Sequence, residues 1–173
     1  MKKPINGATS ATNYGGYRPR APEATSFLMS RVRATNTRME VKLRSALHRQ
    51  GYRFRKNVAA LPGKPDIAFS KERVAIFVDG DYWHGRILKE AGVGALRASL
   101  KTQNREFWVA KLVRNHERDI AVTAELEQLG WMVVRVWESD LKRKMTECMR
   151  SIIGILERRA PRTKCDRRVA ALS

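Results

Sequence analysis

The residues with the clearest chemical potential follow two short apolar runs near the middle of the chain. Asp66 begins the first run, and the second run, residues 73–78, leads directly to Asp79, Asp81 and His84. Strands can hold carboxylates in place around a divalent cation, and a backbone carbonyl of the second run could add a rigid oxygen ligand. Such a metal site is one route to hydrolysis of a phosphodiester.

Each of these residues also has an ordinary structural explanation. A Pro-Asp pair is common in solvent-exposed turns, so Asp66 alone does not indicate a site. Asp79 lies at a strand end, where ligand sites of α/β sheets gather. His84 could act as an acid or a base, or it could pack against the neighbouring tryptophan. Glu40 has capping-box spacing from Thr37, and it could instead orient a metal-bound water.

The segments that would position these residues predict a small sheet. Short apolar or mixed runs indicate strands at residues 52–59, 66–69, 73–78 and 132–137. The last run is almost continuously apolar, which is typical of a buried strand. A long helix before it implies a right-handed parallel crossover. The predicted fold class is therefore α/β, with helices covering a central mixed sheet.

Helical patterns surround these strands. Helices are expected over residues 37–50, 104–129 and 144–158. Gly51 is a natural end for the first of them. The segment 81–102 contains three glycines and is predicted to be a long irregular loop. Trp131 and Trp137 flank or occupy the last strand and are expected in the core.

Aromatic and basic side chains around this segment suit nucleic acid. Tyr82, Trp83, Phe107 and Trp108 are the aromatics expected to leave the core, where they could stack on bases or wedge between them. Phe107 and Trp108 are adjacent on a helix, so only one can face the core squarely. The polar side chains of the same helix could contact phosphates or form an ordinary solvated face; they are Lys111, Arg114, Asn115 and Arg118.

The overall charge indicates the class of partner. The 173 residues carry 35 Lys and Arg against 17 Asp and Glu, a formal net charge of +18. That excess favours a polyanion, with nucleic acid ahead of an anionic membrane because no basic amphipathic helix stands out. No apolar run is long enough to span a bilayer. Cys148 and Cys165 form no CxxC pair and suggest a reducing cytoplasm.

The chain length suits one domain with attached ends. Residues 1–26 are rich in Gly, Pro, Ser, Thr and Asn, and are expected to form a flexible basic arm. Residues 27–141 would form the core that carries the site. Residues 142–173 are expected to form a C-terminal helix and a basic tail.

Over about residues 29–141 the chain resembles the very short patch repair (Vsr) endonuclease family. The resemblance rests on five blocks in one order rather than on one motif. The blocks are residues 33–37 with Glu40, residues 61–66, Phe77-Val78-Asp79-Gly80 with Tyr82-Trp83-His84-Gly85, Phe107-Trp108 with Lys111, Asn115 and Arg118-Asp119, and Leu129-Gly130-Trp131 with Val136-Trp137-Glu138.

The resemblance implies a restriction-endonuclease-like core and a Mg²⁺-dependent hydrolysis of double-stranded DNA. Family members nick the thymine strand at T·G mismatches, which arise when 5-methylcytosine deaminates, on the 5′ side of the mismatched thymine. A cytosine-5 methyltransferase system or a repair polymerase would be a functional partner. The expected location is the cytoplasm, associated with the nucleoid.

The resemblance also implies roles for individual residues. Asp66 matches the metal-binding aspartate, His84 the catalytic histidine, and Glu40 an acidic residue that works through water. Val78 falls where the family places a backbone carbonyl on the metal, and Asp79 is a further candidate ligand. The aromatics that wedge beside the mismatch correspond to Tyr82, Trp83 and Trp108.

The chain departs from the family at a structural zinc. Family members commonly carry zinc ligands at positions that are occupied here by Asp81, Arg86, Leu88 and Ser139. A closed tetrahedral zinc site needs soft ligands, so no structural zinc is predicted. Two other functions stay open: a nuclease of altered target specificity linked to restriction or defence, and an inactive DNA-binding protein of the same fold. Retention of Asp66 and His84 favours the enzyme.

Overall fold

The elements of the fold follow one another with short connections. The computed structural model describes residues 36–159, so the expected N-terminal arm and basic tail lie outside the described residues. The elements are α2 (Arg38–Arg49), β1 (Arg55–Lys56), β2 (Ile67–Phe69), β3 (Val74–Asp79), α3 (Arg86–Ser99), α4 (Arg105–Gln128), β4 (Met132–Trp137) and α5 (Glu138–Arg159).

The sheet is mixed, which confirms the predicted α/β class. Its four strands lie in the order β1-β2-β3-β4. Strand β2 is antiparallel to both β1 and β3, whereas β4 runs parallel to β3 after the connection through α3 and α4. Val78 pairs with Val136, and Asp79 with Trp137, so the ends of the two parallel strands meet at one edge of the sheet. The arrangement is consistent with a restriction-endonuclease-like fold.

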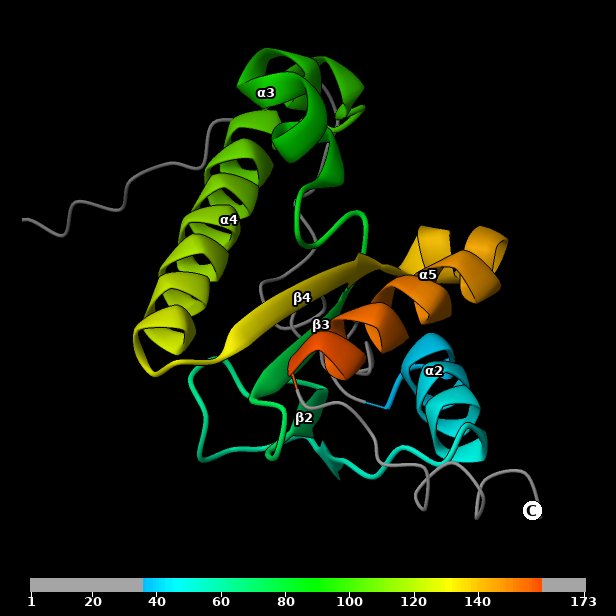
Figure 1. The fold of residues 1–173 in the computed structure, drawn as a ribbon. Helices are drawn as coiled ribbons and strands as arrows, with labels where there is room; N and C mark the ends of the chain where they lie inside the picture. The colour runs from blue at the N-terminus through cyan, green and yellow to red at the C-terminus, as the bar shows by residue number, and fades with distance from the viewer. Residues whose placement is uncertain (1–35, 160–173) are drawn as a thin grey trace, which may run out of the picture. The chain divides into compact units, whose positions relative to one another are not determined.

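Helices cover both faces of this sheet (Figure 1). One face packs on α2 and α5 through a cluster that includes Leu43, Ile76 and Ile152. The other face packs on α4, where Phe77 and Leu126 belong to a second cluster. Alternate β3 side chains therefore enter opposite cores, as the twofold repeat of a strand requires. No helix between residues 36 and 159 is long and apolar enough to cross a membrane.

Two helices form almost as the sequence predicts. The Thr37 hydroxyl accepts from the backbone N–H of Glu40, and the Glu40 side chain accepts in return from the N–H of Thr37, so the capping box is present. Helix α4 covers nearly the whole expected range and ends before Gly130, whose φ of 77° suits glycine. Phe107 is 56% exposed, while Trp108 packs partly against the core, because adjacent residues of a helix cannot both face the core.

The predicted loop over residues 81–102 is wrong, because most of it is helix α3. Its glycines permit turns without preventing the helix: Gly85 precedes it with φ 64°, and Gly92 kinks it with φ 80°. Leu96 and Leu100 pack with Val109 and Leu112 of α4 into a separate apolar cluster. Tertiary packing of that apolar stripe overrides the weak local propensity of a glycine-containing segment.

Three further expectations need correction. Strand β4 is not buried: Met132 is 41% exposed, and the residues 133–137 are half-buried, because β4 lies at an edge of the sheet that residues 36–159 form. Trp137 is accordingly half-buried rather than in the core. Helix α5 begins at Glu138 rather than near Lys144, which is the non-helical residue at a kink inside it.

Candidate active site

Asp66 lies at the start of β2 and contacts the neighbouring strand. Its Oδ2 accepts a hydrogen bond of 2.8 Å from the backbone N–H of Val78. Burial raises the pKa of Asp66 to about 6, the Val78 hydrogen bond opposes that rise, and the negative charges of Glu40 and Asp79 add to it. A carboxylate held among like charges in this way favours a cation as its partner.

Glu40 comes from α2 and is 2% exposed. Its Oε2 accepts from the backbone N–H of Asn36 at 2.8 Å, and its Oε1 accepts from that of Thr37 at 3.2 Å. Arg44 lies one helical turn on, with its Nη2 3.7 Å from Glu40 Oε2. The capping role of Glu40 is therefore confirmed, whereas its role through a metal-bound water stays a prediction.

His84 lies on a turn after β3 and is fixed by α4. Its Nδ1 is 2.7 Å from Asp119 Oδ2 and 3.6 Å from Asp79 Oδ1. Burial alone would lower the pKa of His84, but the Asp119 hydrogen bond and the Asp79 charge raise it above its ordinary value. An ionised carboxylate only accepts, so Nδ1 carries the hydrogen and Nε2 is the nitrogen that exchanges a proton.

Arg135 connects the carboxylates on the α4 side. Its Nη1 lies 2.9 Å from both carboxylate oxygens of Asp79, and its Nη2 is 3.5 Å from Asp119 Oδ1. Burial alone would raise the pKa of Asp119, but the His84 hydrogen bond and the Arg135 charge hold it below its usual value. Asp119, Asp79, His84 and Arg135 line a cavity of about 430 Å³ whose other walls come from α3, α4 and β4.

The predicted aromatics form one cluster beside this turn. The ring of Tyr82 lies 5.1 Å from that of Trp83 and 6.2 Å from that of Trp108, and the two tryptophan rings are 6.0 Å apart. The Nζ of Lys111 lies 5.2 Å from the Trp108 ring centre and 5.8 Å from that of Trp83. Tyr82 is 47% exposed, so this cluster combines accessible aromatic surface with positive charge.

The other residues predicted to contact DNA lie on α4, which also carries Trp108 and Lys111. The amide nitrogen of Asn115 donates to the backbone carbonyl of Trp83 at 3.1 Å, so Asn115 ties the aromatic turn to α4. Arg118 has a 62% exposed side chain, 3.6 Å from Asp119 Oδ1. Their contacts with phosphate stay predictions.

Three charged residues of the site were missed as functional residues. Arg44 lies close enough to Asp66 to lower its pKa. Asp119 follows Asn115 by one helical turn, a spacing that places both on one helix face. Arg135 is the one charge in the apolar run 132–137, and a charge in such a run needs a partner nearby. That interruption was the available signal for the Asp79–Arg135 pair.

The donor set near Asp66 fits magnesium. Mg²⁺ usually keeps several waters and takes only one or two carboxylates. Within residues 36–159 no group of three or more His, Cys, Asp or Glu side chains is placed to hold a metal ion. Asp66 and the Val78 carbonyl would supply the few protein ligands that Mg²⁺ requires, with water at the other positions. Both oxygens of Asp79 are bound to Arg135, which makes Asp79 the weaker candidate ligand.

Comparisons with known proteins identify the family of the chain. The profile of the family described as DNA mismatch endonuclease Vsr matches residues 20–90. A type II nicking enzyme of Neisseria meningitidis serogroup C is 39% identical over 131 residues, which cover 76% of this chain and 84% of the relative. The chain belongs to the Vsr endonuclease family.

Two further Vsr-family relatives show the same extent of likeness. A type II nicking enzyme of Xanthomonas oryzae pv. oryzae is 40% identical, over 70% of this chain and 84% of the relative. The DNA mismatch endonuclease Vsr of Escherichia coli K12 is 36% identical, over 69% of this chain and 73% of the relative. As a Vsr-family member the protein is an endonuclease, and DNA is its substrate.

Proposed function

We propose that this protein nicks the thymine-containing strand at T·G mismatches, in a Mg²⁺-dependent hydrolysis that begins repair of deaminated 5-methylcytosine. The observation that carries the proposal is the turn on which Tyr82, Trp83 and His84 are consecutive. Its first two side chains join the exposed aromatic cluster, and the third joins the Asp119 carboxylate. A base-wedging surface and an acid–base group are thereby held one residue apart.

The acid–base chemistry rests on His84. Asp119 holds Nδ1–H, which presents Nε2 as the atom that takes a proton from the attacking water or returns one. Asp79 and Arg135 fix the surroundings of this pair, since Arg135 bonds to Asp79 and lies close to Asp119. Asp66 and the Val78 carbonyl would hold Mg²⁺, which when bound stabilises negative charge on the phosphate. Glu40 would act on the same region through water.

The DNA-binding surface follows from the same elements. Tyr82, Trp83 and Trp108 would wedge beside the mismatched pair, because exposed rings can partly unstack a base step. Lys111, Arg114 and Arg118 of α4 would bind phosphates, which makes affinity strongly salt-dependent. Because DNA would be the substrate, we expect the protein to associate with the nucleoid. A cytosine-5 methyltransferase system would create the lesion, and a repair polymerase would act on the nick.

The relatives support a second candidate function. Those from Neisseria meningitidis and Xanthomonas oryzae are named type II nicking enzymes. Their names favour a nickase with another target that accompanies a restriction system. In that case the chemistry of Asp66 and His84 is unchanged, and only the sequence or mismatch preference differs.

The deciding experiment measures nicking of strand-labelled duplexes. A T·G duplex and its matched T·A control are incubated with the protein and Mg²⁺, and separately with EDTA. The proposal expects cutting of the thymine strand of the T·G duplex alone, and none with EDTA. Equal cutting of both duplexes would favour the second candidate. Tight binding with no cutting would instead indicate an inactive DNA-binding protein.

A further inference from the structure

A polar cluster outside the catalytic group joins the turn that carries His84 to the junction of β4 and α5. Arg86 Nη1 lies 3.2 Å from Asp81 Oδ1, 2.7 Å from Ser139 Oγ and 3.1 Å from Asp140 Oδ1. Asp81 in turn accepts from the backbone N–H of Ser139 at 3.0 Å and from the Ser139 hydroxyl. We name these four side chains the turn clamp.

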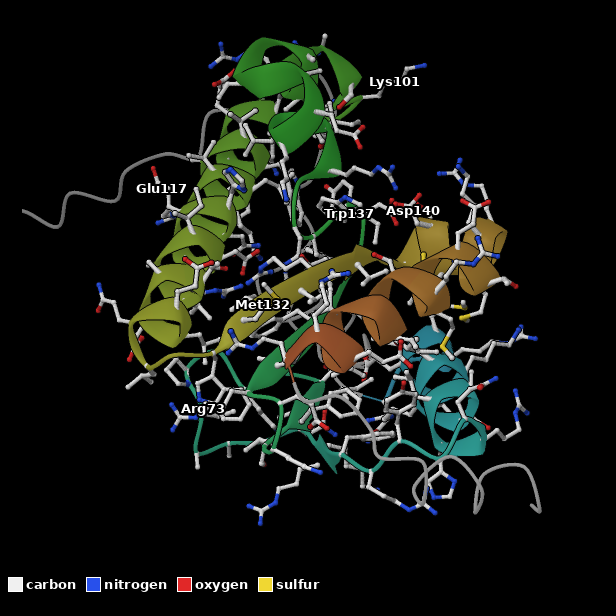
Figure 2. The ribbon with its side chains drawn as sticks, viewed as in Figure 1. Arg73, Lys101, Glu117, Met132, Trp137 and Asp140 are labelled. Atoms are coloured by element: carbon white, nitrogen blue, oxygen red, sulfur yellow. The ribbon has the colours of Figure 1, made fainter. Side chains whose placement is uncertain are left out.

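The turn clamp binds both ends of the short segment 80–86. Within that segment the backbone N–H groups of His84, Gly85 and Arg86 donate to the carbonyls of Gly80, Tyr82 and Asp81. Asp81 and Arg86 stand on either side of His84 and converge on Ser139. Figure 2 labels Trp137 and Asp140 at this junction, and the Arg86 guanidinium lies 5.6 Å from the Trp137 ring centre.

The catalytic and aromatic contacts hold the same turn through a different element. Helix α4 contributes the Asn115 bond to the Trp83 carbonyl and the Asp119 bond to His84. These contacts join the turn to one helix only. The turn clamp adds a second attachment, to α5 and to the end of β4, which is paired in register with β3. Attachment to two separate elements restricts rotation of the turn about α4.

The turn-clamp residues cannot supply a zinc site of the family type. Of the four positions at which family members commonly carry ligands, Arg86 has no lone pair available for a metal and Leu88 has no donor atom. Ser139 already accepts from Arg86 and donates to Asp81. Burial would raise the pKa of Asp81, but the hydrogen bonds from Ser139 and Arg86 hold it below its usual value, so the carboxylate stays ionised for this pairing.

We propose that the turn clamp is a metal-free positioning device that replaces a structural zinc and sets the orientation of His84 and the aromatic cluster. Arg86 is the central residue, since its planar guanidinium is suited to several acceptors at once, in contrast to a point-charged lysine. Asp81, Ser139 and Asp140 are positioning residues: Asp140 acts through Arg86, whereas Asp81 and Ser139 also bond to each other directly. The effect on nicking rests on the proposed function, whereas the effect on the turn itself does not.

Four variants test this assignment. Arg86→Ala removes the centre of the turn clamp, and Ser139→Ala weakens it from the other side without changing net charge. Ser139→Thr keeps the hydroxyl. Arg97→Ala is the matched control, because Arg97 also lies on α3 and pairs bidentately with Glu106 at 2.9 Å, apart from the turn.

Hydrogen exchange at the amides of residues 84–86 is measured first, in the free protein. We expect faster exchange in Arg86→Ala and Ser139→Ala, and wild-type rates in Ser139→Thr and Arg97→Ala. Unchanged exchange in both alanine variants would overturn the proposal. This readout requires neither DNA nor Mg²⁺, so it decides the positioning role even if no duplex is nicked.

Nicking kinetics and metal dependence complete the test. Loss of positioning should lower kcat about 10-fold or more in Arg86→Ala, because small misplacement of a reacting group has large effects, while KM stays near that of Arg97→Ala. A kcat equal to that of the control would overturn the proposal. With no Mg²⁺ added, the melting temperature of the wild-type protein should be the same with and without EDTA. A fall with EDTA that Zn²⁺ but not Mg²⁺ reverses would show that a structural zinc holds the fold and would overturn the proposal.

Discussion

Near α2, Asp66 lies among like charges and its pKa is raised to about 6, whereas near α4, Asp119 lies among cations and its pKa is lowered. Both are aspartates close to the ends of the same parallel strands. Burial raises the pKa of Asp66 most and the charges of Glu40 and Asp79 add to it, while the Val78 hydrogen bond and the Arg44 charge partly offset the rise. Asp119 contacts His84 and Arg135 directly.

The difference separates two kinds of catalytic work. The surroundings of Asp66 leave negative charge uncompensated, and an added cation would relieve it. Asp119 and Asp79 are already compensated, so they can orient His84 and hold it protonated at Nδ1. One fold thus supplies a metal-attracting carboxylate and a positioning carboxylate from the same residue type, through differences in burial and in neighbouring charges.

Removal of Asp66 should have the largest effect. Asp66→Ala is expected to abolish nicking, because it removes the side-chain ligand of Mg²⁺. It should leave duplex affinity unchanged or increase it, since a negative charge near the DNA is lost. Gel-shift and nicking assays on one T·G duplex measure both quantities. Wild-type cutting by this variant would show that the metal site lies elsewhere.

Asp119→Asn tests the other carboxylate. An amide can present a donor to Nδ1 and so favour the wrong tautomer of His84, and we expect kcat to fall roughly 100-fold or more. Duplex affinity should be unaffected, and added Mg²⁺ should not restore the rate. Single-turnover nicking over a range of Mg²⁺ concentrations checks this. Recovery at high Mg²⁺ would mean that Asp119, like Asp66, contributes to the metal site rather than to the positioning of His84.

Arg135→Gln should lower the free energy of unfolding more than the loss of a surface ion pair does. It leaves the Asp79 carboxylate, whose side chain is 5% exposed, without its cation. Breaking a buried pair in this way costs about 3 kcal/mol of unfolding free energy. Arg118→Gln is the control, because that exposed partner of Asp119 should change stability by less than about 1 kcal/mol. Urea unfolding at pH 8 measures both, and equal midpoints would contradict the assigned role of Arg135.

The last prediction concerns the dependence of stability on pH. The pKa of Asp66 rises from 3.8 to about 6 on folding, so its ionised form destabilises the metal-free protein. That cost is full above pH 6 and disappears as pH falls toward 4. Asp66→Asn should therefore be more stable than wild type at pH 8, by up to about 3 kcal/mol, and equal to it near pH 4. Thermal melts with EDTA at the two pH values test this, and no difference at pH 8 would contradict it.

Local sequence signals accounted for a large part of the framework. The capping box of Thr37 and Glu40 and the long helix ending before Gly130 are short-range features, so the sequence predicted them correctly. The same holds for the β2–β3 hairpin, whose strands are separated by four residues. The segment 81–102 failed because its glycines suggested a loop, while the packing of Leu96 and Leu100 on α4 decided the helix.

By itself, then, the sequence determined the α/β order of elements, the positive charge that suits DNA, and the turn in which aromatics precede His84. Only the tertiary structure decided which charges meet. Asp119 reaches His84, Arg135 reaches Asp79, and Ser139 reaches Asp81 across separations of 35, 56 and 58 residues. The physical reason is that a pKa or an ion pair depends on distance in space, which the local pattern of a chain does not encode.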